Sequence, residues 1–318
     1  MTGTERINFE RILCPIGPKP DSEEALRYAI ALAMAYQAEL MVMQCTDGYS
    51  AGGSIDRRHV EETLRDLIAK HLRPPASGAL EAEIVIAEGD PQLAITREAA
   101  ERRVDLIVMR SRRRPYAAAL LGSTAESVCR TAPCPVLVTH PREQEWAGMT
   151  TNEIGLRRVL VAYDFSIDSE LALAYGLSLA QEYQCEIHMI HVLPPRARPE
   201  APEVAYLPFG VETSFNEVAR QLNDAVPDET RLWCKVKQAV RQGHPYREVL
   251  AYAEEQNVDL ICVGASGTGF GMRALFGSNA DRVLRQAPCP VLIARPLRPA
   301  FAAIPAAAAG ETDYEVGR

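Results

Sequence analysis

Apolar residues recur along this chain with two alternating periods, which predicts strands that alternate with helices. Short apolar runs rich in β-branched residues, at 12–16 and 40–45, predict buried strands. Between them, apolar residues recur at helical spacing over 25–33, after capping and acidic residues at 21–23. This alternation favours βαβ units around a parallel sheet that is covered by helices on both faces. Further strands are expected at 83–87, 105–109 and 136–139.

The whole pattern occurs twice. Val104-Asp-Leu-Ile returns as Val258-Asp-Leu-Ile, and Ala132-Pro-Cys-Pro-Val-Leu returns at Ala287. A repeat this long indicates a duplicated domain rather than a solenoid. We therefore predict domains at 6–140 and 156–296, a linker at 141–155 and a disordered tail at 297–318. In the second copy the expected strands are 159–163, 187–193, 233–240, 259–263 and 291–294.

Composition and charge limit where the protein acts and what it binds. The 318 residues are 47% hydrophobic, which is enough to form two packed domains. The net charge of −8 opposes general attraction to nucleic acid or anionic lipid, so a nucleic-acid partner is not expected. Neither a membrane span nor a secretory signal is visible, which predicts a cytoplasmic protein without a membrane partner. The eight cysteines form no C-x-x-C pair, and we expect buried, reduced thiols.

The segment richest in candidate chemistry is the glycine-rich stretch 263–279. It follows a predicted strand and leads into a helix, where backbone N–H groups and the helix N-terminus can hold phosphate. We expect its glycines to permit positive φ and a close approach of a ligand. A Walker A loop is excluded because Phe270, not lysine, follows Gly269, and Met272 breaks the dinucleotide fingerprint. From the pattern alone, a linker loop without a ligand stays open.

Gly264, Gly267, Gly277 and Ser278 match the nucleotide-binding signature of the universal stress protein family. Asp164-Phe165-Ser166 after the first strand and Ala-Pro-Cys-Pro-Val-Leu before the last also resemble this family. The chain therefore resembles a tandem universal stress protein. The resemblance implies α/β architecture with two Rossmann-like domains of the adenine-nucleotide alpha-hydrolase type. Each would have a five-stranded parallel sheet of order 3-2-1-4-5 and a crevice where the order reverses.

The resemblance also implies a ligand and its contacts. The ligand is ATP, with an accompanying Mg²⁺ left open, and no catalytic or metal-binding residue is assigned. Asp164 and the backbone of Val192 would hold adenine and the nearby ribose, and Gly264 would approach the ribose. The family often has a basic residue before the second glycine, which is absent here; whether Arg273 replaces that charge stays open. The phosphates would lie against Gly267, Gly277, Ser278 and Asn279.

The first copy lacks most of this set. Gly17 replaces the aspartate, Cys45 stands at the position of Val192, and Arg110 and Arg113 replace the first two glycines. Only Gly122-Ser123 remains, so we predict a degenerate site. The arginines of 110–114 form either a solvated loop, which is the favoured interpretation, or an anion or nucleic-acid patch.

The function that this sequence favours is an ATP-binding, regulatory stress protein that acts through its second domain. A slow ATP hydrolase and a nucleotide-free module that binds a partner remain alternatives. In the family, domains pair through their last strands, so 136–139 and 291–294 are expected to meet in an intramolecular pseudo-dimer; further association of chains stays open. His188 and His191 should point to opposite faces of one strand. The paired tyrosines should pack in the core, namely Tyr28, Tyr36, Tyr175 and Tyr183.

Overall fold

The computed structural model describes residues 7–17, 23–46, 57–72, 80–111, 122–140, 154–195, 215–266 and 276–295. Strands and helices alternate through the first half (residues 7–140) as the apolar pattern predicts. Pro91 begins the third helix of this half, where the missing N–H of proline costs nothing. The elements are β1 (Arg11–Ile16), α1 (Glu23–Tyr36), β2 (Glu39–Thr46), α2 (Arg57–His71), β3 (Ala82–Glu88), α3 (Pro91–Glu101), β4 (Leu106–Arg110), α4 (Ser123–Thr131) and β5 (Val136–Thr139).

The second half (residues 154–295) repeats this order with one added helical turn. The expected strand 233–240 is wrong at its start, because Trp233 ends the short helix α7 and the strand begins three residues later. The elements are β6 (Arg158–Ala162), α5 (Ile167–Tyr183), β7 (Glu186–Leu193), α6 (Phe215–Asp224), α7 (Thr230–Trp233), β8 (Val236–Gln242), α8 (Pro245–Glu255), β9 (Leu260–Gly264), α9 (Ser278–Gln286) and β10 (Val291–Ala294).

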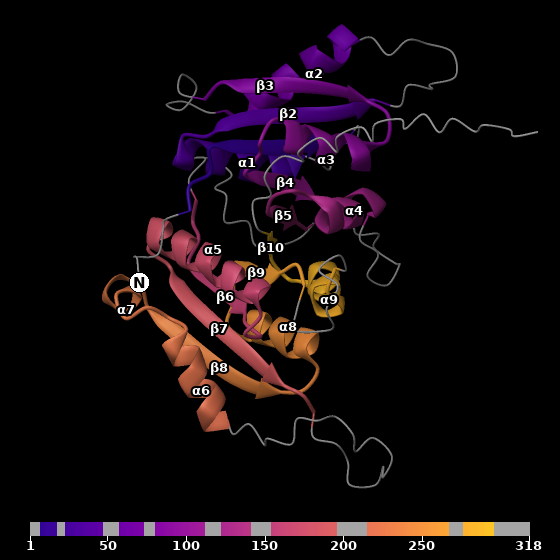
Figure 1. The fold of residues 1–318 in the computed structure, drawn as a ribbon. Coiled ribbons are helices and arrows are strands. Elements are labelled where there is room, and N and C mark those ends of the chain that lie inside the picture. Colours follow the sequence, from indigo (N-terminus) through magenta and orange to yellow (C-terminus); the bar gives the residue numbers. More distant parts are fainter. Residues whose placement is uncertain are drawn as a thin grey trace, which may run out of the picture.

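All ten strands form one sheet, in the order β3-β2-β1-β4-β5-β10-β9-β6-β7-β8 (Figure 1). Within each half the strands are parallel, and each half has the order 3-2-1-4-5. The predicted α/β fold class is thereby confirmed. Because chain order reverses beside β1 and β6, each half has a switch point where a ligand crevice is expected.

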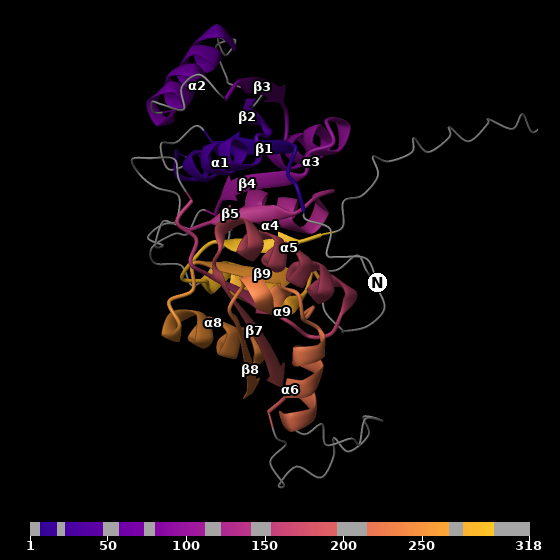
Figure 2. The ribbon, with the colours of Figure 1, turned by 90° about the vertical axis from the view of Figure 1, so that its left-hand side faces the viewer.

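The two halves meet through their last strands. β5 and β10 pair antiparallel, with Leu137 opposite Leu292. In Figures 1 and 2 these strands lie at the middle of the molecule, between the indigo-purple half and the orange-yellow half. Since the junction is antiparallel, the carboxyl ends of the strands in one half point opposite to those in the other. The two switch points therefore lie at opposite edges of the common sheet.

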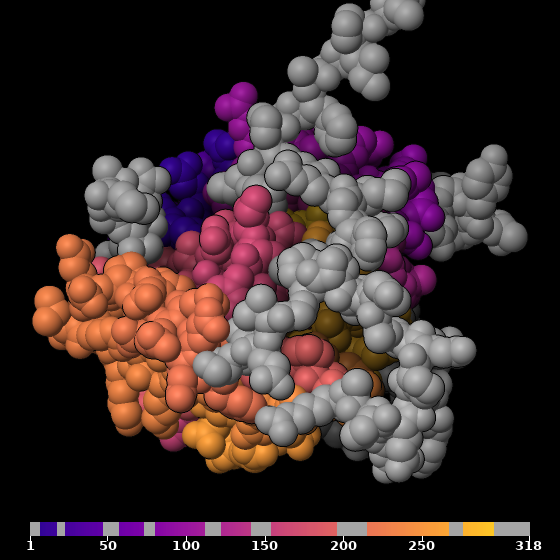
Figure 3. Space-filling model, turned by 60° about the horizontal axis from the view of Figure 1, so that its bottom comes forward, coloured from indigo at the N-terminus to yellow at the C-terminus, as the bar shows by residue number. Residues whose placement is uncertain are grey.

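Two apolar layers cover the sheet, and each contains residues of both halves. One layer joins α1 and α2 to α5 and α6, and the other joins α3 and α4 to α8 and α9. In the space-filling view of Figure 3, pink residues of the second half lie directly against indigo residues of the first. Aromatic rings fill this seam, where Phe9 stacks on Tyr175 at 6.2 Å and meets Tyr36 edge-on at 4.9 Å. The predicted packing role of the paired tyrosines is confirmed, since Tyr28 and Tyr175 are buried in the first of these layers and the half-buried Tyr36 and Tyr183 pack against it.

The cysteines, two histidines and possible membrane spans can also be compared with their predictions. The eight cysteines, all within the described ranges, form no disulfide; seven are buried and Cys45 is half-buried. His188 is buried beside Tyr252 of α8, whereas His191 contacts Phe165 on the other face of β7, as predicted. Within the described ranges, no helix is both long and apolar enough to cross a membrane. The tail 297–318 and residues 141–153 of the expected linker lie outside the described residues.

Candidate functional site

The switch point of the second half lies between β6 and β9, which pair directly. Asp164 follows β6 by two residues, and Gly264 is the last residue of β9. Val192 lies near the end of β7, which pairs with β6 on its other side. Residues that are far apart in sequence thus come to the carboxyl ends of three adjacent strands. Gly267, and the proposed charge substitute Arg273, lie outside the described residues.

Asp164 is held by the start of the helix that follows it. Its Oδ1 accepts hydrogen bonds from the backbone N–H of Ser166, at 3.1 Å, and from the Ser166 hydroxyl. The Ser166 Oγ in turn accepts a hydrogen bond from the N–H of Ser169 and caps α5. Asp164 is half-buried, and it lies just beyond the carboxyl end of β6.

Phe165 adopts an unusual backbone conformation next to this aspartate. Its φ is +63°, a region that a bulky residue enters only when its surroundings hold it there. Its ring lies 5.1 Å from that of Tyr163 and 4.9 Å from that of His191, whose Nδ1 donates to the Tyr163 carbonyl at 2.8 Å. These contacts fix the turn that carries Asp164. No sequence pattern indicates these contacts of Phe165.

Gly264 is a glycine because a helix approaches it closely. A Cβ at this position would lie 2.8 Å from both the carbonyl carbon and the Cβ of Asp168 in the first turn of α5. The Asp168 carboxylate also accepts a hydrogen bond from the Ser266 N–H at 2.8 Å. The end of β9 and the start of α5 are therefore held in close contact. The expectation of positive φ is wrong at Gly264, since packing rather than a left-handed turn excludes a side chain here.

Gly277 begins α9 in an extended conformation, with φ −63° and ψ 136°, so positive φ is not its reason either. Among the described residues, a Cβ at Gly277 would meet only ordinary contacts, the nearest being the Ala265 carbonyl at 3.5 Å. No side chain caps α9, and Ser278 and Asn279 in its first turn are exposed. Toward the described part of the chain, this helix N-terminus therefore presents backbone donors without a side-chain cap and two polar side chains, which is an arrangement suited to an anion.

The sequence model of the Universal stress protein family matches this chain twice, over residues 8–140 and 155–295. The chain belongs to the universal stress protein family. Both halves are thus matched as family domains, including the half without the glycine signature.

Individual relatives agree with this assignment. Universal stress protein YxiE of Bacillus subtilis is 30% identical over 145 residues, which cover 43% of this chain and 98% of the relative. Universal stress protein Rv2005c of Mycobacterium tuberculosis is 28% identical over 222 residues, covering 68% of this chain and 69% of the relative. The crystal structure of a universal stress protein from Archaeoglobus fulgidus superposes with a TM-score of 0.64 at 23% identity. The superposition covers 90% of this chain and 98% of the Archaeoglobus fulgidus chain, and it supports the fold.

The first half of the chain differs from the second at its own switch point, which lies between β1 and β4. Arg110 ends β4 where Gly264 ends β9, and its Nε lies 3.4 Å from Oε2 of Glu24 in α1. Both side chains are largely buried, so the Arg110 charge is compensated within the protein. Gly17 and Cys45 hold the positions of Asp164 and Val192 without a carboxylate. Arg113 and the rest of the 112–114 arginine run lie outside the described residues.

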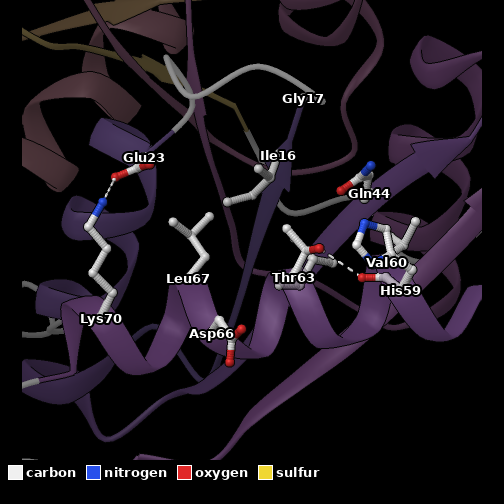
Figure 4. Close-up of a pocket in the computed structure, with 11 residues that line it drawn as sticks. Ile16, Gly17, Glu23, Gln44, His59, Val60, Thr63, Asp66, Leu67 and Lys70 are labelled. Carbon is white, nitrogen blue, oxygen red and sulfur yellow. Dashed lines mark hydrogen bonds and ion pairs between the residues drawn. The ribbon is translucent and has the colours of Figure 1, made fainter.

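The first half instead contains a pocket of about 500 Å³ on the α2 side of the sheet. Figure 4 shows Ile16 and Leu67 pointing into it between two polar ends. At one end, Glu23 accepts a hydrogen bond from Lys70 at 2.7 Å, and at the other lie Gln44 and His59. The described residues that line it include no glycine-rich loop, and Glu23 and Asp66 would repel phosphate. This lining therefore does not repeat the glycine signature of the second half.

Proposed function

We propose that this universal stress protein binds one molecule of ATP per chain, in its second half, and has a regulatory role in the response to stress. The observation that carries the proposal is the open start of α9. Gly277 lacks a side chain although packing leaves room for a Cβ, and Ser278 and Asn279 are exposed beside it. A ligand that occupies this space would account for the glycine.

The proposed contacts follow the strand ends. Asp164 and the backbone of Val192 would hold adenine and ribose, and Gly264 would lie below the ribose. The phosphates would bind Gly267, Gly277, Ser278 and Asn279 at the start of α9. Micromolar affinity requires about 8 kcal/mol, whereas one helix terminus supplies only about 0.3–1 kcal/mol to an anion. Several donors and a buried base must therefore act together, which favours the second half because its sequence keeps Asp164 and the complete glycine signature.

The proposal also concerns a metal ion, the pairing of the two halves and the compartment in which the protein acts. The described residues contain no group of three or more His, Cys, Asp and Glu side chains suited to a metal ion. A Mg²⁺ ion that accompanies ATP would therefore be held mainly by phosphate oxygens and water. We also propose that the β5–β10 pairing makes the chain an intramolecular pseudo-dimer, and that it acts in the cytoplasm.

Calorimetry with ATP tests the nucleotide site. We expect one ATP per chain for the wild type and no binding for Gly277→Val, whose side chain would enter the phosphate position. Gly122 starts α4 with nearly the same backbone conformation, φ −60° and ψ 140°, so Gly122→Val in the first half is the matched control. It should bind ATP as the wild type does. A stoichiometry of two, or ATP binding by a folded Gly277→Val protein, would refute the assignment.

A further inference from the structure

We propose that two arginines, Arg247 of α8 and Arg282 of α9, form a cationic wall of this nucleotide site and select ligands with a phosphate chain. Both are held on the ring of Tyr246. The inference rests on the proposed function and deepens it, because it names the part of the ligand that these side chains recognise.

The three side chains form a compact cluster. The guanidinium carbon of Arg282 lies 4.8 Å from the centroid of the Tyr246 ring, and that of Arg247 lies 5.7 Å from it. The Arg247 Nε also donates a hydrogen bond to the Tyr246 hydroxyl at 2.9 Å. Tyr246 is half-buried against the apolar layer that also contains Val192, while both arginines are exposed. The ring thus fixes two cations at the surface by cation–π contact.

The cluster lies at the edge of the sheet that carries the candidate site. α8 begins three residues after β8, and α9 begins after the loop that follows β9, so both helices start at the carboxyl ends of parallel strands. Figure 1 shows α8 and α9 side by side. Arg282 is one turn beyond Ser278 on the same face of α9, and long helical side chains lean toward the helix N-terminus. Its guanidinium lies on the ring of Tyr246, in the first turn of the neighbouring helix α8.

Within the described ranges, the charges of the two arginines have no carboxylate partner. By contrast, Arg285 of the same helix α9 binds Asp281 and Glu126. Arg247 also lies in the first turn of α8, where the helix dipole disfavours a cation. Two unbalanced cations beside two helix N-termini repel one another and the dipoles. An anion bound at this edge removes that repulsion.

The cluster occurs in only one half. The positions that match Tyr246, Arg247 and Arg282 in the first half are Gln92, Leu93 and Ser127. They carry neither an aromatic ring nor a charge, and Leu93 is 73% exposed. The first half lacks the first two glycines of the signature, and it also lacks these arginines. We therefore assign both features to the binding of one ligand. The pair also supplies the positive charge that Ala265-Ser266 does not provide.

The test compares ATP with AMP, which share the nucleoside and differ in the length of the phosphate chain. Calorimetry on the full chain gives both dissociation constants for the wild type, Arg247→Gln, Arg282→Gln and the double variant. We expect each single variant to weaken ATP binding about tenfold and the double variant up to about a hundredfold, with a smaller loss for AMP. Tenfold corresponds to about 1.4 kcal/mol. Melting temperatures should match that of the wild type.

Controls separate recognition from general charge and from folding. Arg220→Gln removes an exposed arginine of α6 whose Nε donates to the Asn216 carbonyl of its own helix, and both affinities should stay unchanged. Tyr246 is a positioning residue: Tyr246→Leu should lower the preference for ATP over AMP, and Tyr246→Phe, which keeps the ring, should largely restore it. An unchanged preference in the double variant would overturn this inference and leave ATP binding intact. Failure of the wild type to bind either nucleotide would overturn the proposed function itself.

Discussion

Arg285 of α9 lies 2.7 Å from Glu126 of α4, so that an ion pair joins the two halves beside the β5–β10 junction. Arg285 also binds Asp281 one turn earlier, and Arg130 binds Glu126 in the same way on α4. The four residues occupy matching positions of the two halves. They form a nearly symmetric network across the seam.

We expect Arg285→Ala to lower the free energy of unfolding by about 1–2 kcal/mol. The side chains of Arg285 and Glu126 are 16% and 29% exposed, which places the pair between surface pairs of about 0.2–1 kcal/mol and buried pairs of about 3–5 kcal/mol. Denaturant unfolding of Arg285→Ala, Glu126→Ala and the double variant gives the coupling energy. A coupling near zero would show that the contact does not stabilise the seam.

The two site glycines should respond differently to an added methyl group. Gly264→Ala places a Cβ 2.8 Å from the backbone of Asp168, which we expect to cost about 1–3 kcal/mol through forced displacement of α5. Gly277→Ala meets no contact closer than 3.5 Å and should change stability little. Thermal unfolding of both variants measures the difference. Equal losses would contradict the close approach of α5 to β9.

Glu186 should make stability depend on pH in the acid range. A hydrogen bond from Lys235, with further ones from Lys237 and His188, lowers the pKa of Glu186 to about 2. Because the folded-state pKa lies below the unfolded value of about 4.3, the contribution is present above that value and disappears as pH falls toward 2. Glu186→Gln should therefore be less stable than the wild type at pH 6, with a difference that shrinks below pH 4. Denaturant unfolding at several pH values checks this, and a constant difference would contradict it.

Thiol reagents should modify the native protein first at Cys45. Burial raises the pKa of Cys129 and Cys185 to about 12 and also raises that of Cys14, so these thiols are inaccessible and protonated. Cys45 is the half-buried one of the eight. Timed alkylation followed by peptide mass spectrometry gives the order of labelling. The Cys45→Ser variant should lose the fastest phase, and early labelling of Cys14 would contradict the described packing.

The architecture could be predicted from sequence because it depends on local periodicity and on an internal repeat. Runs of buried residues identified the strands, and the recurrence of Ala-Pro-Cys-Pro-Val-Leu identified the duplication. The start of β8 was missed because Trp233 extends an apolar run that continues into the strand, although Thr230–Trp233 forms a helical turn. Apolar content alone does not separate these two conformations.

The site could be predicted only where a motif is contiguous or belongs to a known family. Gly264 belongs to the sequence motif, yet the contact that requires a glycine there comes from Asp168, far away in sequence. The cluster of Tyr246, Arg247 and Arg282 joins two helices, and no spacing rule brings them together. The strained Phe165 follows from packing against His191, which only the folded sheet provides.

Because each apolar layer runs through both halves, unfolding of one half would expose the core of the other. We therefore expect the chain to melt as a single cooperative unit, and an isolated half to aggregate through the edges of β5 or β10. The half without a glycine signature is then indispensable as a scaffold. Substitutions deep in its core should lower the fraction of folded molecules. They should thereby weaken binding at the distant proposed ATP site, although none of them contacts that site.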